Sequence, residues 1–382
     1  MKNLKLRIEK EEFRTVRREC YFLILNSQFL ILCVSLLLCS VAPSACLAQT
    51  KQGGLKFKFS PGDKYSLVSV AEQKMAGVVD GNEQVSEQTT RLECDFDIEE
   101  VDDSGCAWAK YTYKRVTMKL RSAKQKVDFD SDANLLKTPL RAVPLRLAMG
   151  EEIYLRITPQ GRIEKINGLQ ALITSAKAKM GNFAGADIAV QGITQLFAEP
   201  TIRRELENQF RIFPEPNEPG ATWSRTEILS SAEAGYPKAE QVEEANIVFE
   251  KTFRLNPGKS VGLAIPSGSQ DGIAVVDVNL VIKPASVPIL STPASESPVG
   301  GSMEILGGGT GQIKIEETTG RIISSKMTED TTGKVIYVAQ GPMLRPPPAS
   351  EPITTHTVTT FQMTKVAEGK PAQPADANEK GA

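Results

Sequence analysis

The sequence predicts a mainly β fold (α+β), with two duplicated antiparallel β units that form half-barrel or sandwich-like curved sheets. Most of the chain alternates apolar and polar residues with a period of two, which is typical of strands with one buried face. A short pattern also occurs twice, as SPGDKYS at residues 60–66 and EPGATWS at residues 218–224. Each copy is followed about a hundred residues later by Gly-Arg-Ile. We therefore interpret the chain as a tandem repeat with a short helical segment between the copies.

The residues of this repeat have structural explanations. Proline presets the backbone angle of a turn and glycine accepts positive φ, so each Pro-Gly pair can hold a turn that opens a strand. The aromatic residue that follows is expected to be a core anchor rather than a ligand contact, because a buried aromatic side chain contributes a large apolar area. The predicted repeat anchors are Pro61, Gly62, Tyr65, Gly161, Pro219, Gly220, Trp223 and Gly320.

The first β-rich unit is predicted over residues 51–168. Its first strand is expected at Leu55–Phe59, where apolar residues alternate with lysines. Leu92–Val101 and Cys106–Arg121 are expected to form a hairpin around the turn at residues 102–105. In the first of these strands every second residue is acidic, from Glu93 to Glu99, and this acidic side is interpreted as a solvated sheet face.

A helical connection is predicted over residues 169–213. Leu169, Leu172, Ile173 and Ala176 have helical spacing, and further apolar residues follow before Pro214. Two or three short helices are expected, with Gly181, Gly185 and Pro200 as breakers. Helices between sheets usually cover a core, and this role is favoured over a specific binding element.

The second β-rich unit is predicted over residues 214–366. Alternating strands are expected at the segments 247–253, 276–282, 312–316, 335–338 and 356–366, with a further strand from Ile322 after the Gly-Arg turn. The Pro- and Ser-rich segments 284–301 and 341–352 are expected to be loops or extended connections rather than packed elements. Residues 367–382 are expected to be a disordered polar tail.

The first 48 residues are predicted to be an export signal. Phe29–Ala42 is an uncharged apolar run after several basic residues, with the length of a signal-peptide core, and cleavage is expected after Ala48. Extension of the apolar run back to Tyr21 leaves an uncleaved anchor as an alternative. A further alternative is a lipoprotein in which Cys46 is lipidated, although Pro43 stands where that pattern wants leucine. The protein is expected to be periplasmic, cell-surface or secreted.

Two cysteines remain after the predicted targeting segment. The hairpin pairs Val101 with Cys106 and leaves Cys94 seven residues further along its strand. At about 3.4 Å per residue this separates the two cysteines by roughly 24 Å, whereas a disulfide needs α-carbons within about 7 Å. Cys94 and Cys106 are therefore predicted not to bond to each other.

The sequence contains little that supports catalysis. His356 is the single histidine and is interpreted as an exposed strand residue, because no nucleophile motif accompanies it. The glycine-rich segment 307–311 lacks the lysine and following helix of a phosphate-binding loop, and a flexible hairpin turn is the preferred interpretation. We predict a non-enzyme without a cofactor.

One segment has the spacing that opens a calcium-binding loop, with Asp128, Asp130, Asp132 and Asn134 at alternate positions. However, Ala133 stands where the loop requires glycine and Pro139 where it requires the bidentate glutamate. A solvated turn after a strand that ends near Phe129 is therefore predicted, and no metal site.

These motifs together resemble a known family. Leu55–Tyr65, Asp130-Ser131, Gly161-Arg162-Ile163 and Phe213-Pro214 before Pro219-Gly220 are similar to an uncharacterised family of secreted bacterial β-rich proteins, of the domain of unknown function 6263 type. The resemblance covers about Lys51–Val366 and implies export and a duplicated β-rich fold. It implies no activity and carries no functional residues.

Two functional classes follow from the sequence. A net charge of -1 offers no electrostatic attraction to nucleic acid. The first class is an exported envelope protein that binds a lipid or other apolar ligand between two curved β units, by analogy at the level of the fold alone. The alternative is a structural or protein-interaction module of the envelope without a small-molecule site; a hydrolase is favoured less. A functional site is expected where the two β units face each other.

Overall fold

The structure is a computed structural model. It describes residues 55–79, 82–123, 125–133, 138, 142–180, 186–210, 213, 222–230, 246–256, 272–289, 300–338 and 352–366. The predicted targeting segment, its cleavage point at Ala48 and the lipidation candidate Cys46 lie outside these residues, as does the predicted tail. Among the described residues, no helix is both long enough and apolar enough to cross a membrane.

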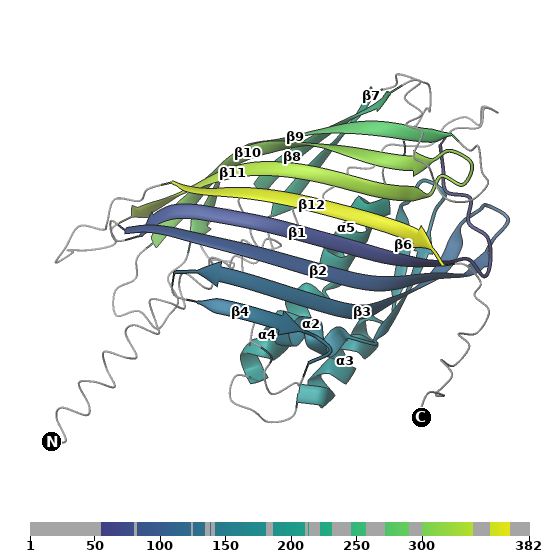
Figure 1. The fold of residues 1–382 in the computed structure, drawn as a ribbon, viewed down its shortest axis with the longest axis horizontal. Coiled ribbons are helices and arrows are strands. Elements are labelled where there is room, and N and C mark those ends of the chain that lie inside the picture. Colours follow the sequence, from purple (N-terminus) through teal and green to yellow (C-terminus); the bar gives the residue numbers. More distant parts are fainter. Residues whose placement is uncertain are drawn as a thin grey trace, which may run out of the picture.

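The fold is dominated by one open, antiparallel 12-stranded sheet, which confirms the prediction of a mainly β protein (Figure 1). The strand order is β6-β5-β3-β2-β1-β12-β11-β10-β9-β8-β7, and β4 pairs with β3 off this path. The strands are β1 (Lys64–Val79), β2 (Asn82–Val101), β3 (Ala107–Ser122), β4 (Lys126–Asp130), β5 (Glu152–Ile157), β6 (Ile163–Asn167), β7 (Thr222–Ser230), β8 (Asn246–Asn256), β9 (Ile273–Ile289), β10 (Gly300–Glu316), β11 (Ile322–Val338) and β12 (Ile353–Lys365).

The strands expected for the two β units meet in the middle of this sheet. β1, the first strand of the chain, pairs with β12, the last, over the register from Tyr65↔Lys365 to Ala76↔Thr354. The strands before and after the helices therefore share one sheet and one core rather than forming two separate sheets. The edges of the sheet are β6 and β7, which flank the helical connection in the sequence.

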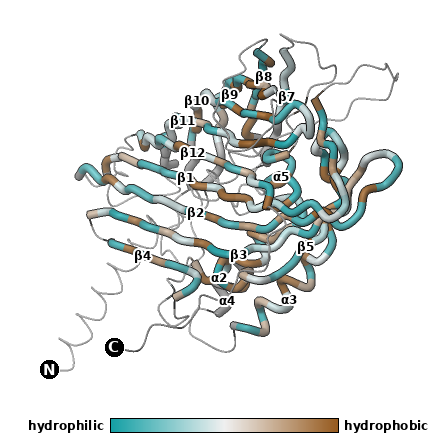
Figure 2. Tube along the Cα trace, turned by 45° about the vertical axis from the view of Figure 1, so that its right-hand side comes forward, coloured by the Kyte–Doolittle hydropathy of each residue, from teal (hydrophilic) through white to brown (hydrophobic). Residues whose placement is uncertain are grey.

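One face of this sheet is buried and the other is solvated. In β12 the buried residues alternate strictly with residues that are exposed or half-buried, from Ile353 to Met363. Figure 2 shows the same alternation of hydrophobic and hydrophilic residues along neighbouring strands. The buried side is called the inner face below. The acidic residues of β2 lie on the opposite, outer face, as expected, where Asp95 pairs with Lys114 at 2.9 Å.

The helices gather on the inner side, towards the end of the sheet that holds β5 and β6 (Figure 1). The predicted helical connection forms α3 (Leu169–Met180), α4 (Ala186–Leu196) and α5 (Glu199–Phe210). Pro200 stands at the break between α4 and α5, as predicted. It lies in the first turn of α5, where its missing N–H and fixed φ are tolerated. An additional short helix, α2 (Val143–Ala148), was not predicted.

Aromatic side chains join the helices to the inner face. Phe210 of α5 is fully buried, and its ring centroid lies 5.1 Å from that of Phe96 in β2 and 6.0 Å from that of Phe57. The same cluster includes Phe253 from β8 and Met363 from β12. One continuous core therefore connects strands from both halves of the chain at this end of the sheet.

The segment 55–59 differs from its prediction, because it is extended but belongs to no strand. Its N–H groups instead reach two turns. Phe57 donates to the carbonyl of Pro159 at 2.8 Å, and Lys58 donates to the carbonyl of Thr319 at 2.8 Å. These turns connect β5 to β6 and β10 to β11. The lysine and phenylalanine alternation therefore reflects a segment that lies between two turns, with Phe57 buried in the core.

The β2–β3 hairpin was predicted with a register error of one residue. Val101 pairs with Ala107, not with Cys106, because the Asp102 side chain and carbonyl hold a slightly longer turn. Gly105 occupies that turn with a φ of 80°. The conclusion for the cysteines holds: Cys94 and Cys106 are both free and buried.

Two further predictions of irregular structure were wrong. Gly307–Gly311 is not a hairpin turn but lies inside β10. Residues 284–289, expected to be a linker, continue β9, and Pro284 lies opposite a register shift between Ile305 and Gly307. Proline is tolerated in a strand at such a bulge, where it does not interrupt a regular ladder. Residues 300 and 301, also expected in that linker, begin β10, and residues 290–299 and 341–351 lie outside the described part of the chain.

Candidate functional site

The candidate site is a group of polar side chains buried on the inner face. It lies away from the part of the sheet against which the helices pack. Polar residues are normally exposed, so a buried group of them on a sheet face is informative. We call this group the polar band. Its members are Gln73, Ser86, Gln88, Lys251, Glu329, Thr331, Thr355, Thr357 and Thr359, each at most 9% exposed.

Strand register brings the polar band together. Residues that are directly paired across antiparallel strands have side chains on the same face. Glu329 of β11 pairs with Thr357 of β12, which pairs with Gln73 of β1. On the other side of Glu329, pairing runs through Gly309 and Leu280 to Lys251 of β8. Residues from both halves of the chain therefore form a single row across the sheet.

Glycines in β10 leave room beside this row. Gly307, Gly309 and Gly311 alternate along the strand, and backbone carbonyls and side chains of β11 occupy the space where their side chains would stand. A Cβ at Gly309 would lie 2.9 Å from Cγ of Glu329, and one at Gly307 would lie 3.0 Å from Cγ2 of Thr331. The glycines therefore let the backbone of β11 and the side chains of Glu329 and Thr331 lie close against β10, which is the role of a segment first interpreted as a turn.

Several atoms of the polar band have no hydrogen-bond partner within the described part of the chain. They are Oε1 of Glu329 and Oγ1 of Thr331, Thr355 and Thr359. These side chains are between 2% and 5% exposed. A buried polar group without a partner costs about 1–3 kcal/mol, so most such groups in native proteins are satisfied by protein, water or ligand. Four such atoms on neighbouring rows point to a partner that the described part of the chain does not supply.

The carboxyl group of Glu329 is adapted to this environment. Burial raises its pKa from 4.5 to about 7, and the charge of Lys251 acts in the opposite direction. At neutral pH the side chain can therefore donate a proton in one state and accept hydrogen bonds in the other. The threonine hydroxyls can do both, because each has one donor and two acceptor sites.

Apolar side chains flank the polar band on the inner face. Next to Thr331, pairing along the sheet passes through Gly307 to Ile282 and then to Phe249. In the other direction it passes through Thr355 to Met75. Met75, Phe249 and Ile282 are each at most 4% exposed. The site thus combines an apolar surface with a row of hydrogen-bonding groups.

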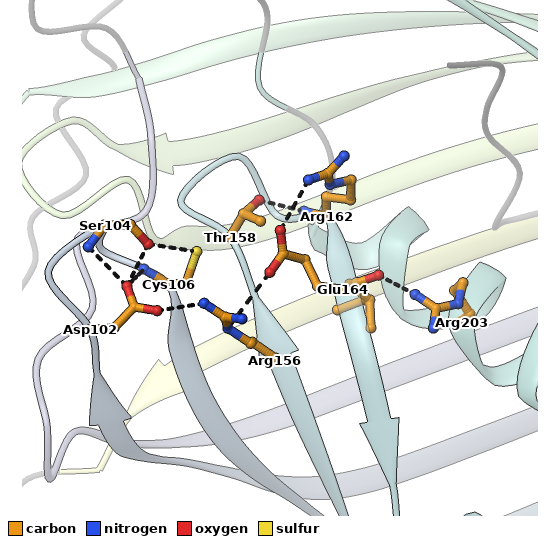
Figure 3. A network of polar contacts seen from close by, with 9 residues as sticks. Asp102, Ser104, Cys106, Arg156, Thr158, Arg162, Glu164 and Arg203 are labelled. Atoms are coloured by element: carbon orange, nitrogen blue, oxygen red, sulfur yellow. Dashed lines mark hydrogen bonds and ion pairs between the residues drawn. The ribbon is translucent and has the colours of Figure 1, made fainter. Parts of the chain in front are cut away.

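A second polar cluster lies at the β2–β3 turn and continues along β5 and β6 (Figure 3). Asp102 accepts hydrogen bonds from the hydroxyl and N–H of Ser104 at 2.5 and 2.9 Å, and from Nη2 of Arg156 at 2.7 Å. These donors lower the pKa of Asp102 to about 2. Arg156 also lies 3.6 Å from Glu164. Since Ser104 donates to a carboxylate that is already paired with arginine, this arrangement stabilises a turn and does not activate a nucleophile.

The predicted repeat anchors occupy structural positions where the structure describes them. Tyr65 is buried at the start of β1, and its hydroxyl donates to Oδ2 of Asp63 at 2.9 Å; burial raises its pKa. Trp223 lies near the start of β7 and stacks on Phe253, with ring centroids 5.3 Å apart.

The glycine anchors hold turns. Gly62, Gly161 and Gly320 have positive φ angles of 86°, 80° and 67°. Pro61 and Gly62 form a turn that is separated from β1 only by Asp63, while Pro219 and Gly220 lie outside the described residues. The equivalence of the two copies stays a prediction.

The other candidate residues are paired on the surface. His356 lies on the outer face, with Nδ1 2.7 Å from Oδ1 of Asp330. Asp130 lies 2.6 Å from Nη2 of Arg115, and Asp132 lies 3.4 Å from Nε of the same residue. Asp128 lies 3.4 Å from Arg121, whereas Asn134 is outside the described residues. Among the residues that the structure describes, no group of three or more His, Cys, Asp or Glu is placed to hold a metal ion.

Sequence reasoning missed the polar band. The segment Thr354–Thr360 is rich in threonine, and alternate residues at 355, 357 and 359 share one face with Phe361 and Met363. These threonines occupy the same alternate positions as the apolar residues at the end of the strand. That pattern could have indicated a buried polar row. Glu329 carried no such signal, because its neighbours in the sequence are also polar and its row depends on pairing between distant strands.

The fold and the inner face define a mainly β protein with a curved open sheet, and one family model matches part of its chain. Residues 107–241 match the model of a family described as "Family of unknown function (DUF6263)". This confirms the family resemblance over those residues, which run from β3 past the end of β7. No curated protein matches the chain.

Among solved structures, a structure on lipid–protein interactions in lipovitellin matches 82% of this chain and 26% of its own, with 10% identity and a TM-score of 0.38. This chain thus spans about a quarter of the length of that protein. Pseudomonas aeruginosa OpdQ matches 80% of this chain and 99% of its own, with 6% identity and a TM-score of 0.17. The translocator domain of autotransporter NalP from Neisseria meningitidis matches 80% and 90%, with 4% identity and a TM-score of 0.14.

Proposed function

We propose that this protein is an exported, non-enzymatic protein of the cell envelope that binds a lipid or other apolar ligand on the inner face of its curved sheet. The observation that carries this proposal is the apolar character of the inner face beyond the helices. Phe249, Ile282, Ile305 and Met75 continue it towards the far strand ends. The helices meanwhile pack closely against β3, β5 and β6.

Export is proposed from the N-terminal sequence. Phe29–Ala42 follows a basic stretch and has the length of a signal-peptide core, with cleavage proposed after Ala48. Lipidation of Cys46 or an uncleaved anchor would keep the protein at a membrane instead. All three put the ligand-binding domain outside the cytoplasm, in the compartment where envelope lipids are handled.

The alternative of a protein-interaction module has less support. Such a protein would carry a contiguous apolar patch on its surface. Among the described residues the large exposed apolar side chains are Val85, Val281, Leu306 and Val366, which come from β2, β9, β10 and the residue after β12. The apolar side chains are therefore concentrated on the buried inner face.

The test is native mass spectrometry, with lipid extraction, of the full chain purified from membranes in mild detergent. We expect lipid to co-purify reproducibly. Ala71 and Val70 are neighbours on β1 that point to opposite faces, and Ala71 is in the row of Thr359 on the inner face. Ala71→Trp should reduce the bound lipid, and Val70→Trp should not. Reproducible absence of lipid from the unmodified protein would sink the proposal.

A further inference from the structure

We infer that the polar band is a subsite for an uncharged, hydroxyl-bearing head group of the ligand, such as the glycerol of an acylglycerol or the sugar of a glycolipid. This inference rests on the proposed function and specifies the class of ligand. The acyl part would lie along the apolar inner face, and the head group would meet the row that contains Glu329 and the threonines.

The first support is the hydrogen-bonding capacity that the protein leaves unused. Oγ1 of Thr331, Thr355 and Thr359 and Oε1 of Glu329 lack partners in the described part of the chain, although their side chains are at least nine-tenths buried. Thr331 pairs directly with Thr355, and Glu329 with Thr357, so these groups lie on adjacent rows of two neighbouring strands. A ligand with several adjacent hydroxyl groups matches this arrangement, because each hydroxyl can both donate and accept.

The second support is the distribution of charge, because each kind of ionic head group would meet one like charge in the polar band. A phosphate or carboxylate would meet the carboxyl group of Glu329, and its negative charge would oppose ionisation of that group. An ammonium group would meet the charge of Lys251, which is close enough to act on the pKa of Glu329. A neutral polyol avoids both repulsions and can bond to Glu329 in either protonation state.

The third support is the close approach that the glycines of β10 allow. Because Gly307 and Gly309 have no side chains on this face, Thr331 and Glu329 lie close against β10. Larger residues there would force these side chains away from that strand. Three alternate glycines make a strand less stable, because glycine has no side chain to pack and loses more conformational entropy on folding. The sequence of β10 therefore favours close approach of the polar groups over the stability of the strand.

The test compares ligands that share one acyl chain. Full-length protein, purified and delipidated, carries an apolar fluorescent probe, which is displaced by 1-oleoylglycerol, methyl oleate or 1-oleoyl-lysophosphatidic acid. Hydrogen bonds to two hydroxyl groups, at about 0.7 kcal/mol each, predict that 1-oleoylglycerol displaces the probe at a roughly tenfold lower concentration than methyl oleate. The anionic ligand should not exceed methyl oleate.

Matched variants assign this preference to the polar band. The double variant Thr355→Val with Thr359→Val should lose the tenfold preference. Thr354→Val with Thr360→Val changes the exposed positions on the outer face of the same strand and should keep it. If the inner double variant does not fold, the single variant Thr331→Val is used in the same way, with a partial loss expected.

The outcomes separate the two proposals. Equal displacement by 1-oleoylglycerol and methyl oleate would overturn the head-group subsite and leave apolar binding intact, with water as the partner of the threonines. Stronger displacement by 1-oleoyl-lysophosphatidic acid than by methyl oleate would overturn the inference that the head group is uncharged. Failure of all three ligands to displace a bound probe, or of the probe to bind, would overturn the proposed function itself.

Discussion

Gly320 lies where the fold leaves no space for a side chain. Its φ of 67° is a left-handed conformation, and a Cβ there would overlap the carbonyl group of Lys56 and lie 2.8 Å from the N atom of Phe57. The glycine thus allows the segment 55–59 to lie against the β10–β11 turn. The doubled Gly-Arg-Ile pattern of the sequence marks this close approach.

We expect Gly320→Ala to be strongly destabilising. Gly62→Ala is the matched control, because Gly62 also has a positive φ but a Cβ there would meet nothing within 4 Å. The control should cost about 1–2 kcal/mol from its backbone conformation alone, and Gly320→Ala clearly more. Urea unfolding followed by circular dichroism measures both. Equal costs would mean that segment 55–59 does not pack against this turn.

Glu329 makes stability depend on pH in the opposite direction from most carboxylates. Burial raises its pKa to about 7 in the folded protein, from 4.5 for the free group. Between these values the folded state binds more protons than the unfolded state, so the free energy of unfolding falls as pH rises. The contribution is complete below about pH 4.5 and is lost as pH passes 7.

We therefore expect Glu329→Gln to flatten the decrease in stability between pH 4.5 and pH 8. The raised pKa corresponds to a decrease on the order of 3 kcal/mol in the unmodified protein. Burial also raises the pKa of Glu205 to about 7, with the same sign, so part of the dependence should remain. Because Glu205 is half-buried as a residue and Glu329 is 3% exposed, the prediction rests on Glu329. Unfolding curves that retain the full dependence would contradict it.

At the scale of elements, α5 connects the helices to the sheet. Phe210 packs between Phe96 and Phe57 and is fully buried. We expect Phe210→Ala to cost about 3–5 kcal/mol, because it leaves a cavity in the cluster. Gln195→Ala in α4 is the control at an exposed position and should change stability by less than about 0.5 kcal/mol. Thermal unfolding that shows similar values for both would mean that α5 is not docked.

Many elements could be predicted because their signals are local. The alternation that ends at Met363 predicted the last strand, and the helical spacing at Leu169 predicted α3. The failures are equally physical. Gly307–Gly311 contains residues typical of turns. In the structure, however, atoms of the neighbouring strand β11 lie where the side chains of larger residues would stand. Similarly, Pro284 was read as a linker residue, although a bulge accommodates it.

At the scale of the whole molecule, the pairing of β1 with β12 joins the two halves of the chain. Periodicity within strands could not predict this pairing, because it says which residues share a face but not which distant strands become neighbours. The polar band depends on it directly, since Gln73 and Thr357 come from opposite ends of the sequence. The site was therefore less predictable than the strands that form it.

A cross-link tests that pairing. Val70 is directly paired with Thr360 on the outer face, so Val70→Cys with Thr360→Cys should form a disulfide under mild oxidation. Val70→Cys with Lys365→Cys is the control, because Lys365 pairs with Tyr65 instead, five residues along β1. Mass spectrometry of peptides from the oxidised protein identifies the bond. A disulfide in the control but not in the first pair would refute the register.

The central claim is that the inner face of the sheet holds an apolar ligand. The most direct measurement is photo-cross-linking of the full-length protein with a monoacylglycerol that carries a diazirine in its acyl chain, followed by mapping of the adducts by mass spectrometry. We predict adducts on inner-face residues such as Met75, Phe249 and Ile282. Adducts that fall on outer-face neighbours such as Lys74 or Val281, or none that unlabelled monoacylglycerol competes away, would contradict the account.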